Sequence, residues 1–333
     1  MILSNVLQRV AAGSPVRVRT PAIFDPASAP ANEIASYALL VIGICAALFL
    51  VVGGLTFYAL LRFRARPGDD EREPPQIYAS SQIEIAWTVV PIVIVFLLAL
   101  VTARTILVLQ KDEAPIGSLE ITAIGHQWWW EFHYPEYGFT TANELHIPLS
   151  DPSDPWPTFL DLQSQDVIHS FWVPRLSGKT DVVPNRTNHL WMAPTQPGVY
   201  VGQCAEYCGT QHAGMLLRVV VESRADFERW VERQRGPAVS RASLASEQAL
   251  FEATACISCH RIRGTRAQGR FGPDLTHLMS RETLGAGVAR NDRSNLIQWV
   301  ASPDHFKPGA LMPAMQLPPD QVERIVDYLV SLE

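Results

Sequence analysis

One short segment of the sequence gathers four side chains that bind soft metal ions. Residues 202–215, GQCAEYCGTQHAGM, contain Cys204 and Cys208 four positions apart, followed by His212 and Met215. Thiolate, imidazole and thioether ligands together favour copper, whereas methionine is a poor ligand for zinc. Because two thiolates can bridge two metal ions, this segment predicts a binuclear copper centre. The alternative, a structural disulfide between the two cysteines, would leave the histidine and the methionine without a role.

In such a centre each copper needs one histidine, so a second histidine must come from elsewhere in the chain. His169 is the best candidate, because it lies in DVIHSFWVP, a segment with the pattern of a β-strand. The alternatives, for which we expect surface or packing roles, are His126, His133, His146 and His189.

A second cysteine pair has the spacing of a covalent haem attachment site. In the motif CISCH, two thiols one helical turn apart can add to the two vinyl groups of one haem. Cys256 and Cys259 supply the thiols, and His260 follows directly to bind the iron from the same side. The alternatives are a redox CxxC motif or half of a zinc site, which would need two more ligands, for which His277 and His305 are the candidates.

An electron-carrying haem also needs a sixth ligand, and methionine in that position raises the reduction potential. Met279, Met312 and Met315 lie in this part of the chain. Met312 is the predicted ligand, because its Pro/Gly-containing loop, KPGALMP, comes just before the last predicted helix. Met315 is the alternative.

The composition limits the class of protein. Of the 333 residues, 47% are hydrophobic and 18% are charged, which excludes a disordered chain. The net charge of −6 argues against binding to nucleic acid, for which a basic face is usual. Five cysteines cannot all pair in disulfides within the chain. If four of them hold copper and haem, Cys45 is left, and its apolar surroundings predict a packing role.

Two long apolar segments predict a membrane anchor rather than buried core helices. Residues 37–61 contain no charge and are long enough to cross a bilayer, and residues 85–103 form a second such segment. Met1–Val10 shows no clear signal peptide. The loop between the two segments is rich in arginine, which predicts that it is cytoplasmic and that both chain ends lie outside. These arginines are Arg62, Arg64, Arg66 and Arg72.

The remaining sequence predicts two polar domains. From about residue 117 to 222, short alternating runs separated by Gly, Pro and Asp predict a Greek-key β-sandwich or barrel, and this stretch is acidic. An amphipathic helix then ends at Gly236-Pro237, and helical patterns follow. The chain is therefore expected to be a multi-domain protein. Its expected parts are an external N-terminal segment (1–35), a transmembrane helix hairpin (36–104), an all-β domain (105–222), a linker helix (223–242) and an all-α domain (243–333).

The all-α part, residues 243–333, resembles a class I cytochrome c domain. FGPDL at 271–275 is similar to the loop that supports the proximal histidine in that family, through the carbonyl of Pro273. The resemblance also places Phe251 and Tyr328 in a crossed pair formed by the first and last helices of the domain.

Residues from about 26 to 222 resemble cytochrome c oxidase subunit II, whose CuA domain has a cupredoxin-like fold. The resemblance implies that Cys204 and Cys208 bridge the two coppers and that His169 and His212 bind one copper each. Met215 would be one axial ligand.

The same resemblance gives Glu206 two tasks. Its backbone carbonyl would be the other axial ligand of the copper pair, and its carboxylate would help to bind magnesium at the interface with the catalytic subunit. The alternative for the carboxylate is an ordinary solvated loop residue.

Three further segments match this family. Trp128, in GHQWWWEF, falls at the tryptophan through which electrons enter, although a tryptophan run is more often packing. Glu84, in EIAWTVVP, falls at the mouth of a proton path into the catalytic subunit. Lys179 and Asp181, in LSGKTDVVPNR, match an interface with that subunit, and a structural salt bridge is the alternative.

The fused order of membrane hairpin, CuA domain and cytochrome c domain resembles subunit II of the caa-type bacterial oxidases. This implies a location in the bacterial inner membrane, in contact with lipid, with both redox domains on the periplasmic side. An external c-type cytochrome or another donor would reduce the haem, the electron would pass to CuA, and subunit I would reduce dioxygen to water with proton translocation. Subunit III is a further implied partner. The alternative is a CuA-containing subunit of a nitric oxide reductase.

Electron transfer from the fused haem to the copper should depend only weakly on ionic strength. Residues 241–333 carry ten basic and ten acidic residues, so this domain is neutral overall. A short tether gives an effective concentration of roughly mM, so electrostatic steering adds little. The measurement is flash-initiated transfer between the two centres across a salt series, and a steep loss of rate with salt would contradict the prediction.

Overall fold

The computed structural model describes residues 18–64, 76, 80–238 and 241–333. The predictions for Met1–Val10 and for Arg66 and Arg72 fall outside these residues. The described chain forms two compact units, of which one is Asn32–Gln110 and the other holds the remaining residues.

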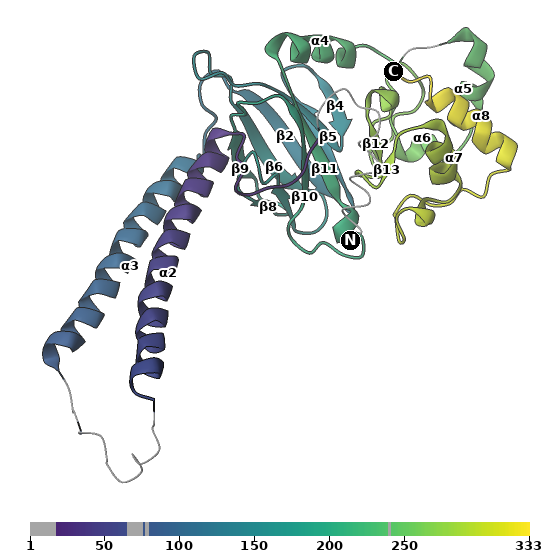
Figure 1. The fold of residues 1–333 in the computed structure, drawn as a ribbon. Coiled ribbons are helices and arrows are strands. Elements are labelled where there is room, and N and C mark those ends of the chain that lie inside the picture. Colours follow the sequence, from purple (N-terminus) through teal and green to yellow (C-terminus); the bar gives the residue numbers. More distant parts are fainter. Residues whose placement is uncertain (1–17, 65–75, 77–79, 239–240) are drawn as a thin grey trace. The chain divides into compact units, whose positions relative to one another are not determined.

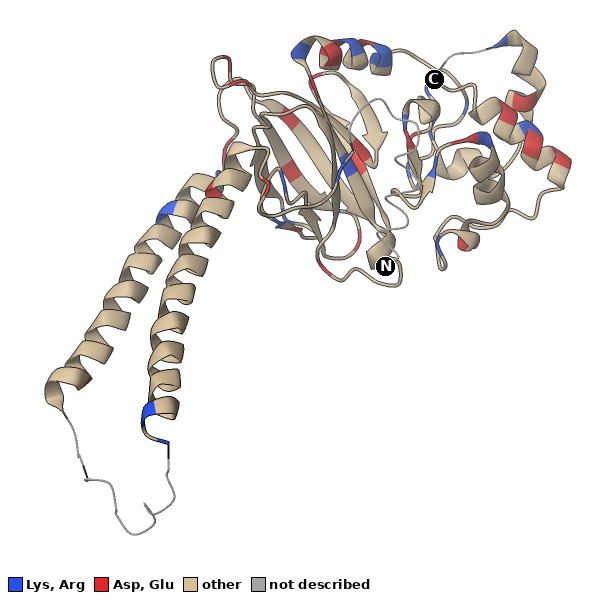
Figure 2. Cartoon of the chain, in the orientation of Figure 1, with Lys and Arg blue, Asp and Glu red and all other residues tan. Residues whose placement is uncertain are grey.

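Two long helices supply the first unit. α2 (Ala29–Arg62) and α3 (Ser81–Leu109) each contain an 18-residue stretch with a mean hydropathy of 2.8, which is long and apolar enough to cross a membrane (Figure 1). Their charged residues lie only toward the helix ends (Figure 2). The hydroxyls of Tyr37 and Thr102, 2.5 Å apart, join the two helices. The predicted hairpin is therefore present, and both helices extend beyond the predicted spans.

Two β-sheets form the first domain of the second unit. One sheet has the strand order β4-β3-β2-β6-β9 and the other β5-β11-β10-β7-β8, with β1 beside β10. Strands distant in sequence are neighbours in both sheets, which confirms the predicted cupredoxin-like layout. The strands are β1 (Val18–Arg19), β2 (Leu119–His126), β3 (Trp129–Tyr134), β4 (Phe139–Ala142), β5 (Glu144–Pro148), β6 (Thr158–Ser164), β7 (His169–Trp172), β8 (Thr180–Val182), β9 (Asn188–Met192), β10 (Gly198–Cys204) and β11 (Leu216–Glu222).

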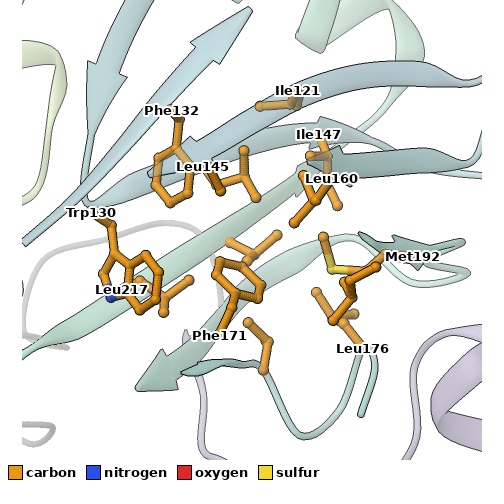
Figure 3. Packing of buried hydrophobic residues seen from close by; sticks show 14 of the residues in the cluster. Ile121, Trp130, Phe132, Leu145, Ile147, Leu160, Phe171, Leu176, Met192 and Leu217 are labelled. Atoms are coloured by element: carbon orange, nitrogen blue, oxygen red, sulfur yellow. The ribbon is translucent and has the colours of Figure 1, made fainter. Parts of the chain in front are cut away.

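The core between the sheets explains how the tryptophan run is used. Trp130 and Phe132 of β3 point into the core, where Trp130 packs edge-on against Phe171 of β7 with ring centroids 5.4 Å apart (Figure 3). Because side chains alternate between the two faces of a strand, Trp129 lies on the opposite face and is only half-buried. Of the three consecutive tryptophans, Trp130 packs in the core. Trp128 and Trp129 lie outside this core and remain partly exposed.

The predicted linker helix packs against the β domain. α4 (Arg224–Arg235) begins after Ser223, whose hydroxyl accepts a hydrogen bond from the Asp226 N–H. Phe227 and Trp230 of this helix are buried in the β-domain core, and Trp230 stacks on His146 with ring centroids 4.2 Å apart. The connection to the next domain therefore starts from a fixed position.

The last domain has the helices expected of a cytochrome c. Phe251 of α5 and Tyr328 of α8 lie 5.7 Å apart between ring centroids, as the resemblance implied. A small hairpin, β12–β13, was not expected from the sequence. The elements are α5 (Ala245–Glu252), α6 (Cys256–Cys259), α7 (Arg293–Ala301), α8 (Pro319–Leu329), β12 (Thr283–Leu284), β13 (Ala289–Arg290) and the 3₁₀ turns η2 (Ala242–Leu244), η3 (Leu278–Ser280) and η4 (Pro303–His305).

Candidate copper and haem sites

The predicted copper ligands converge where β7 and β10 end. Cys204 is the last residue of β10, and its register partner on β7 is Phe171, two residues after His169. His212 opens the 3₁₀ turn η1 (His212–Gly214), and Met215 follows that turn directly. The Cys204 N–H donates to the Met215 carbonyl over 3.0 Å, which closes the loop between them.

The sulfur and nitrogen atoms lie at spacings that suit a shared pair of metal ions. The two Sγ atoms of Cys204 and Cys208 are 3.7 Å apart and unbonded. His169 Nδ1 lies 4.0 Å from Cys204 Sγ, and His212 Nδ1 lies 3.7 Å from Cys208 Sγ. Each thiol thus has one imidazole beside it. This donor set fits a binuclear copper centre and does not fit a disulfide.

The two predicted axial groups lie against the same sulfurs. Met215 Sδ is 3.8 Å from Cys208 Sγ, and the Glu206 carbonyl oxygen is 3.1 Å from Cys204 Sγ. The side chain of Glu206 is exposed.

The protonation states of the Cys204 and Cys208 thiols depend on each other. The contact between the two thiols lowers the pKa of Cys204 and raises the pKa of Cys208. Burial opposes the shift at Cys204, and His169 supports it. The opposite shifts favour one thiolate beside one thiol, and a thiolate is the form that binds a metal ion.

Asp166 orients the His169 ring, and sequence reasoning did not identify it. Its Oδ1 lies 2.8 Å from His169 Nε2, so the ring turns Nδ1 toward Cys204. Burial alone would lower the pKa of His169, but its hydrogen bonds and charge interactions with Asp166 and Cys204 together outweigh burial, and the pKa is raised. Asp166 also accepts from the Gln127 N–H over 2.6 Å. In the sequence, Asp166 could have been noticed because it lies three residues before His169, a candidate copper ligand.

The four alternative histidines pair with carboxylates elsewhere in the β domain. His146 Nδ1 lies 3.0 Å from Glu222. Burial would raise the pKa of Glu131, but hydrogen bonds with two of these histidines outweigh it and the pKa is about 2. The pairs are His126 with Glu131, His133 with Glu131, His146 with Glu222 and His189 with Asp161. Their prediction as packing or surface residues agrees with these contacts.

The CISCH motif is held so that His260 can use one nitrogen for iron. His260 Nδ1 lies 2.8 Å from the Pro273 carbonyl, which leaves Nε2 available. A Cβ on Gly272 would lie only 2.6 Å from His260 Cε1, and a Cβ on Gly269 would lie 2.4 Å from the Cys259 carbonyl carbon. Both glycines are therefore needed for the close approach of this loop. The arrangement fits a covalently attached haem.

A largely apolar cavity next to His260 has walls from both domains. Cys256, Cys259, Met312 and Met315 line it, so both candidate sixth ligands face the haem site. Met279 instead packs against the core of the cytochrome domain. The β domain contributes the half-buried segment Gln127, Trp128 and Trp129 to the wall.

Trp128 connects this cavity to the copper loop. Its indole Nε1 donates to the Cys208 carbonyl over 2.9 Å, and the Gln127 side-chain amide donates to the same carbonyl over 2.8 Å. Glu84 lies in the first turn of α3, in the other unit. Asp181 in β8 and Lys179 directly before this strand are both exposed.

Comparison with known proteins identifies the family. Family models match three successive parts of the chain: the transmembrane domain of cytochrome c oxidase subunit II at 19–104, its periplasmic domain at 156–223, and cytochrome c at 247–333. Cytochrome c oxidase subunit 2 of Alkalihalophilus pseudofirmus is 36% identical over 93% of this chain and 90% of its own length. This chain belongs to the cytochrome c oxidase subunit II family.

Other subunit II proteins extend the comparison. A Bacillus cytochrome c oxidase subunit 2 is 32% identical over 81% of this chain and 80% of its own length. The crystal structure of the periplasmic domain of subunit II of Bradyrhizobium japonicum cytochrome oxidase is 29% identical, with a TM-score of 0.34, and covers 37% of this chain and 97% of that one.

Membership of this family gives the general function of the chain. The chain is part of a cytochrome c oxidase complex, a haem-copper oxidase, as a membrane-anchored subunit with a CuA domain and a cytochrome c domain. The fused cytochrome domain confirms the predicted resemblance to the caa type.

Replacing Asp166 should weaken copper binding without removing a ligand. In Asp166→Asn the carboxylate that orients His169 is lost, and such changes cost about 10- to 100-fold in metal affinity. The measurement is a copper competition titration of the full chain. Asp161→Asn is the matched control, because Asp161 pairs with His189 away from the copper ligands. Equal affinities in both variants would contradict the role of Asp166.

Proposed function

We propose that this subunit relays single electrons from an external donor, through its c-type haem and then its CuA centre, to subunit I, where dioxygen is reduced to water with proton translocation. Haem and copper, when bound, each accept and release one electron. The observation that carries the proposal is the position of Trp128, which lines the cavity beside His260 and donates a hydrogen bond to Cys208. The donor would be a c-type cytochrome or another external reductant.

The copper ligands are proposed as His169, Cys204, Glu206, Cys208, His212 and Met215. Cys204, Cys208, His169 and Met215 are buried, which excludes water from the site and keeps these groups in place. The carbonyl of Ser170 accepts from the Ala205 N–H over 2.9 Å, which ties the cysteine loop to β7. A rigid, dry ligand set needs little rearrangement when the charge of the centre changes.

The haem ligands are proposed as Cys256, Cys259, His260 and Met312. The Pro273 carbonyl lies within hydrogen-bond distance of His260 Nδ1 and holds the ring in place. Met312, which lies near the C-terminal end of the domain, also lines the cavity. Trp128 is proposed as the residue through which the electron reaches the copper loop.

The exposed residues near the copper loop are proposed as the contact with subunit I. Tyr207 is 75% exposed although it is large and aromatic, which is typical of a surface that another protein covers. Glu206 beside it is proposed to share a magnesium ion with subunit I, and Lys179 with Asp181 is proposed to belong to the same interface. Subunit III is a further proposed partner.

The proposed location is the bacterial inner membrane with both redox domains on the periplasmic side. Arg62 and Arg64 follow the apolar part of α2, and basic residues favour the cytoplasmic side. Glu84, in the first turn of α3, would then lie at the cytoplasmic boundary, where we propose that it receives protons for subunit I. The oxidase relatives favour dioxygen over nitric oxide as the final electron acceptor.

Removing one bridging thiol should stop the relay at the haem. In the complex with Cys204→Ser, the near-infrared absorption of CuA should be lost and the c-type haem band kept, and the reduced haem should no longer be oxidised by dioxygen. Cys45→Ser is the matched control, because Cys45 lies in α2, outside both sites. Normal oxidation of the haem in Cys204→Ser would show that electrons do not pass through the copper.

Two methionine variants should separate the candidate sixth ligands. Met312→Leu should lose the methionine–iron charge-transfer band and lower the haem potential, because leucine offers no ligand atom. Met315→Leu keeps Met312 and should retain both properties. The opposite pattern would transfer the assignment to Met315.

A further inference from the structure

A small set of polar contacts joins the cytochrome domain to the copper-bearing β domain within the second unit. The contacts come from the hairpin segment, defined as residues 282–288, and from Lys307. They are made to β5, to β11 and to the loops beside the copper ligands. None of these residues was singled out by the sequence, and none is a proposed metal or haem ligand.

Glu144 is a buried carboxylate of the β domain that is satisfied by the other domain. It lies in β5 and is 3% exposed. It accepts from the backbone N–H groups of Glu282 (3.0 Å) and Thr283 (2.9 Å) and from the Thr283 hydroxyl (2.8 Å). A buried charge without such partners is strongly unfavourable. Glu144 therefore favours the docked arrangement over a loosely tethered one.

Arg218 adds a pair that crosses the same boundary. It is the register partner of Glu144 on β11 and is 6% exposed. Its Nη1 lies 2.6 Å from Glu282 Oε2. The cytochrome domain thus supplies a carboxylate to the buried arginine and N–H donors to the buried carboxylate.

Lys307 makes the complementary contact from the cytochrome domain. It is 3% exposed, and its ammonium donates to the carbonyls of Trp128 (2.6 Å), Gly214 (2.9 Å) and Gly285 (2.9 Å). All three protons are used. Trp128 belongs to the cavity wall and Gly214 precedes Met215, so one side chain holds the copper loop, the tryptophan segment and the hairpin segment together.

The backbone of the hairpin segment allows it to lie close to β11. The Leu216 N–H of β11 donates to the Ala286 carbonyl over 3.1 Å. Gly287 has a φ of +87°, and a Cβ there would lie 3.0 Å from the Leu216 Cβ. A larger residue at this position would push the two domains apart.

We propose that Lys307 and Glu144 are positioning residues that lock the fused cytochrome domain on the β domain, with the haem cavity closed by Trp128. The docked domain then occupies the surface of Trp128 that an external cytochrome would need. External donors would therefore reduce a haem held by Cys256, Cys259 and His260 and would not reach the copper loop directly. The kinetic part of this inference rests on the proposed electron route, whereas the docking part does not.

The test compares three full-length variants in the assembled oxidase: Lys307→Met, Glu144→Gln and the matched control Lys111→Met. Lys111 lies in the β-domain unit with its ammonium 4.5 Å from the Trp191 ring centroid, away from the docking contacts. The first readout is hydrogen exchange at the amides of Leu216, Glu282 and Thr283. The second is the rate of haem-to-copper electron transfer.

Both docking variants should exchange these amides about 10- to 100-fold faster, since each leaves buried polar groups unpaired, and both should slow the transfer. The control should change neither. Unchanged exchange in both variants overturns the docking. Faster exchange with an unchanged transfer rate overturns the positioning role. If the copper receives no electron from the haem even in the unmodified protein, the proposed route fails, while the exchange result still decides the docking. Should Lys307→Met lose the haem or copper spectrum, Glu144→Gln decides alone.

Discussion

Hydrogen bonding of β10 to β7 and β11 is the constraint on which the functional unit depends. It places Cys204 opposite Phe171, and because side chains alternate along a strand, His169 lies on the same face as Phe171. The bond from the Cys204 N–H to Met215 brings the thioether back to the strand that the loop left. A slip of one residue would send Cys204 to the opposite face and dismantle the ligand set.

The Cys208 carbonyl extends this constraint beyond the metal ligands. Gln127 and Trp128 both donate to it, and the carboxylate that receives the Gln127 N–H also orients His169. The ligands and the tryptophan segment therefore form one connected set of hydrogen bonds. Movement of Trp128 relative to the copper loop would break bonds on both sides, so the link between the haem cavity and the copper loop is rigid.

Buried charge makes the contact between the two domains specific. Glu144 and Lys307 are almost fully buried, and burial of an ionised group is costly unless hydrogen bonds satisfy it. Each finds its partners wholly or mainly in the other domain, at distances of 2.6–3.0 Å. An apolar contact would tolerate sliding, whereas these contacts specify one orientation. The neutral overall charge of the cytochrome domain is compatible with this, because a few fixed contacts replace long-range attraction.

Residues that act with near neighbours could be predicted from the sequence. The spacing of Cys204, Cys208 and His212 and the CISCH motif carry their chemistry within one loop or one helical turn, and the membrane helices follow from uninterrupted apolar length. The choice of His169 needed more, because only a family resemblance and a strand pattern distinguished it from four other histidines. The structure brings it to Cys204 and pairs the other four elsewhere.

What only the tertiary structure decided is the set of contacts made across long stretches of chain. Lys307 meets Trp128 across 179 residues, and Glu144 meets Glu282 across 138. In the sequence Lys307 is one lysine in a polar loop, and Glu144 is one acid in an acidic domain. Their partners are mostly backbone carbonyl and N–H groups, which every residue carries, so no residue type marks them. Sequence by itself predicted the candidate ligands and determined the order of the domains, because local spacing encodes local chemistry. The contacts that join the candidate haem cavity to the candidate copper loop were decided by sheet register and domain docking, because these depend on burial summed over the whole fold.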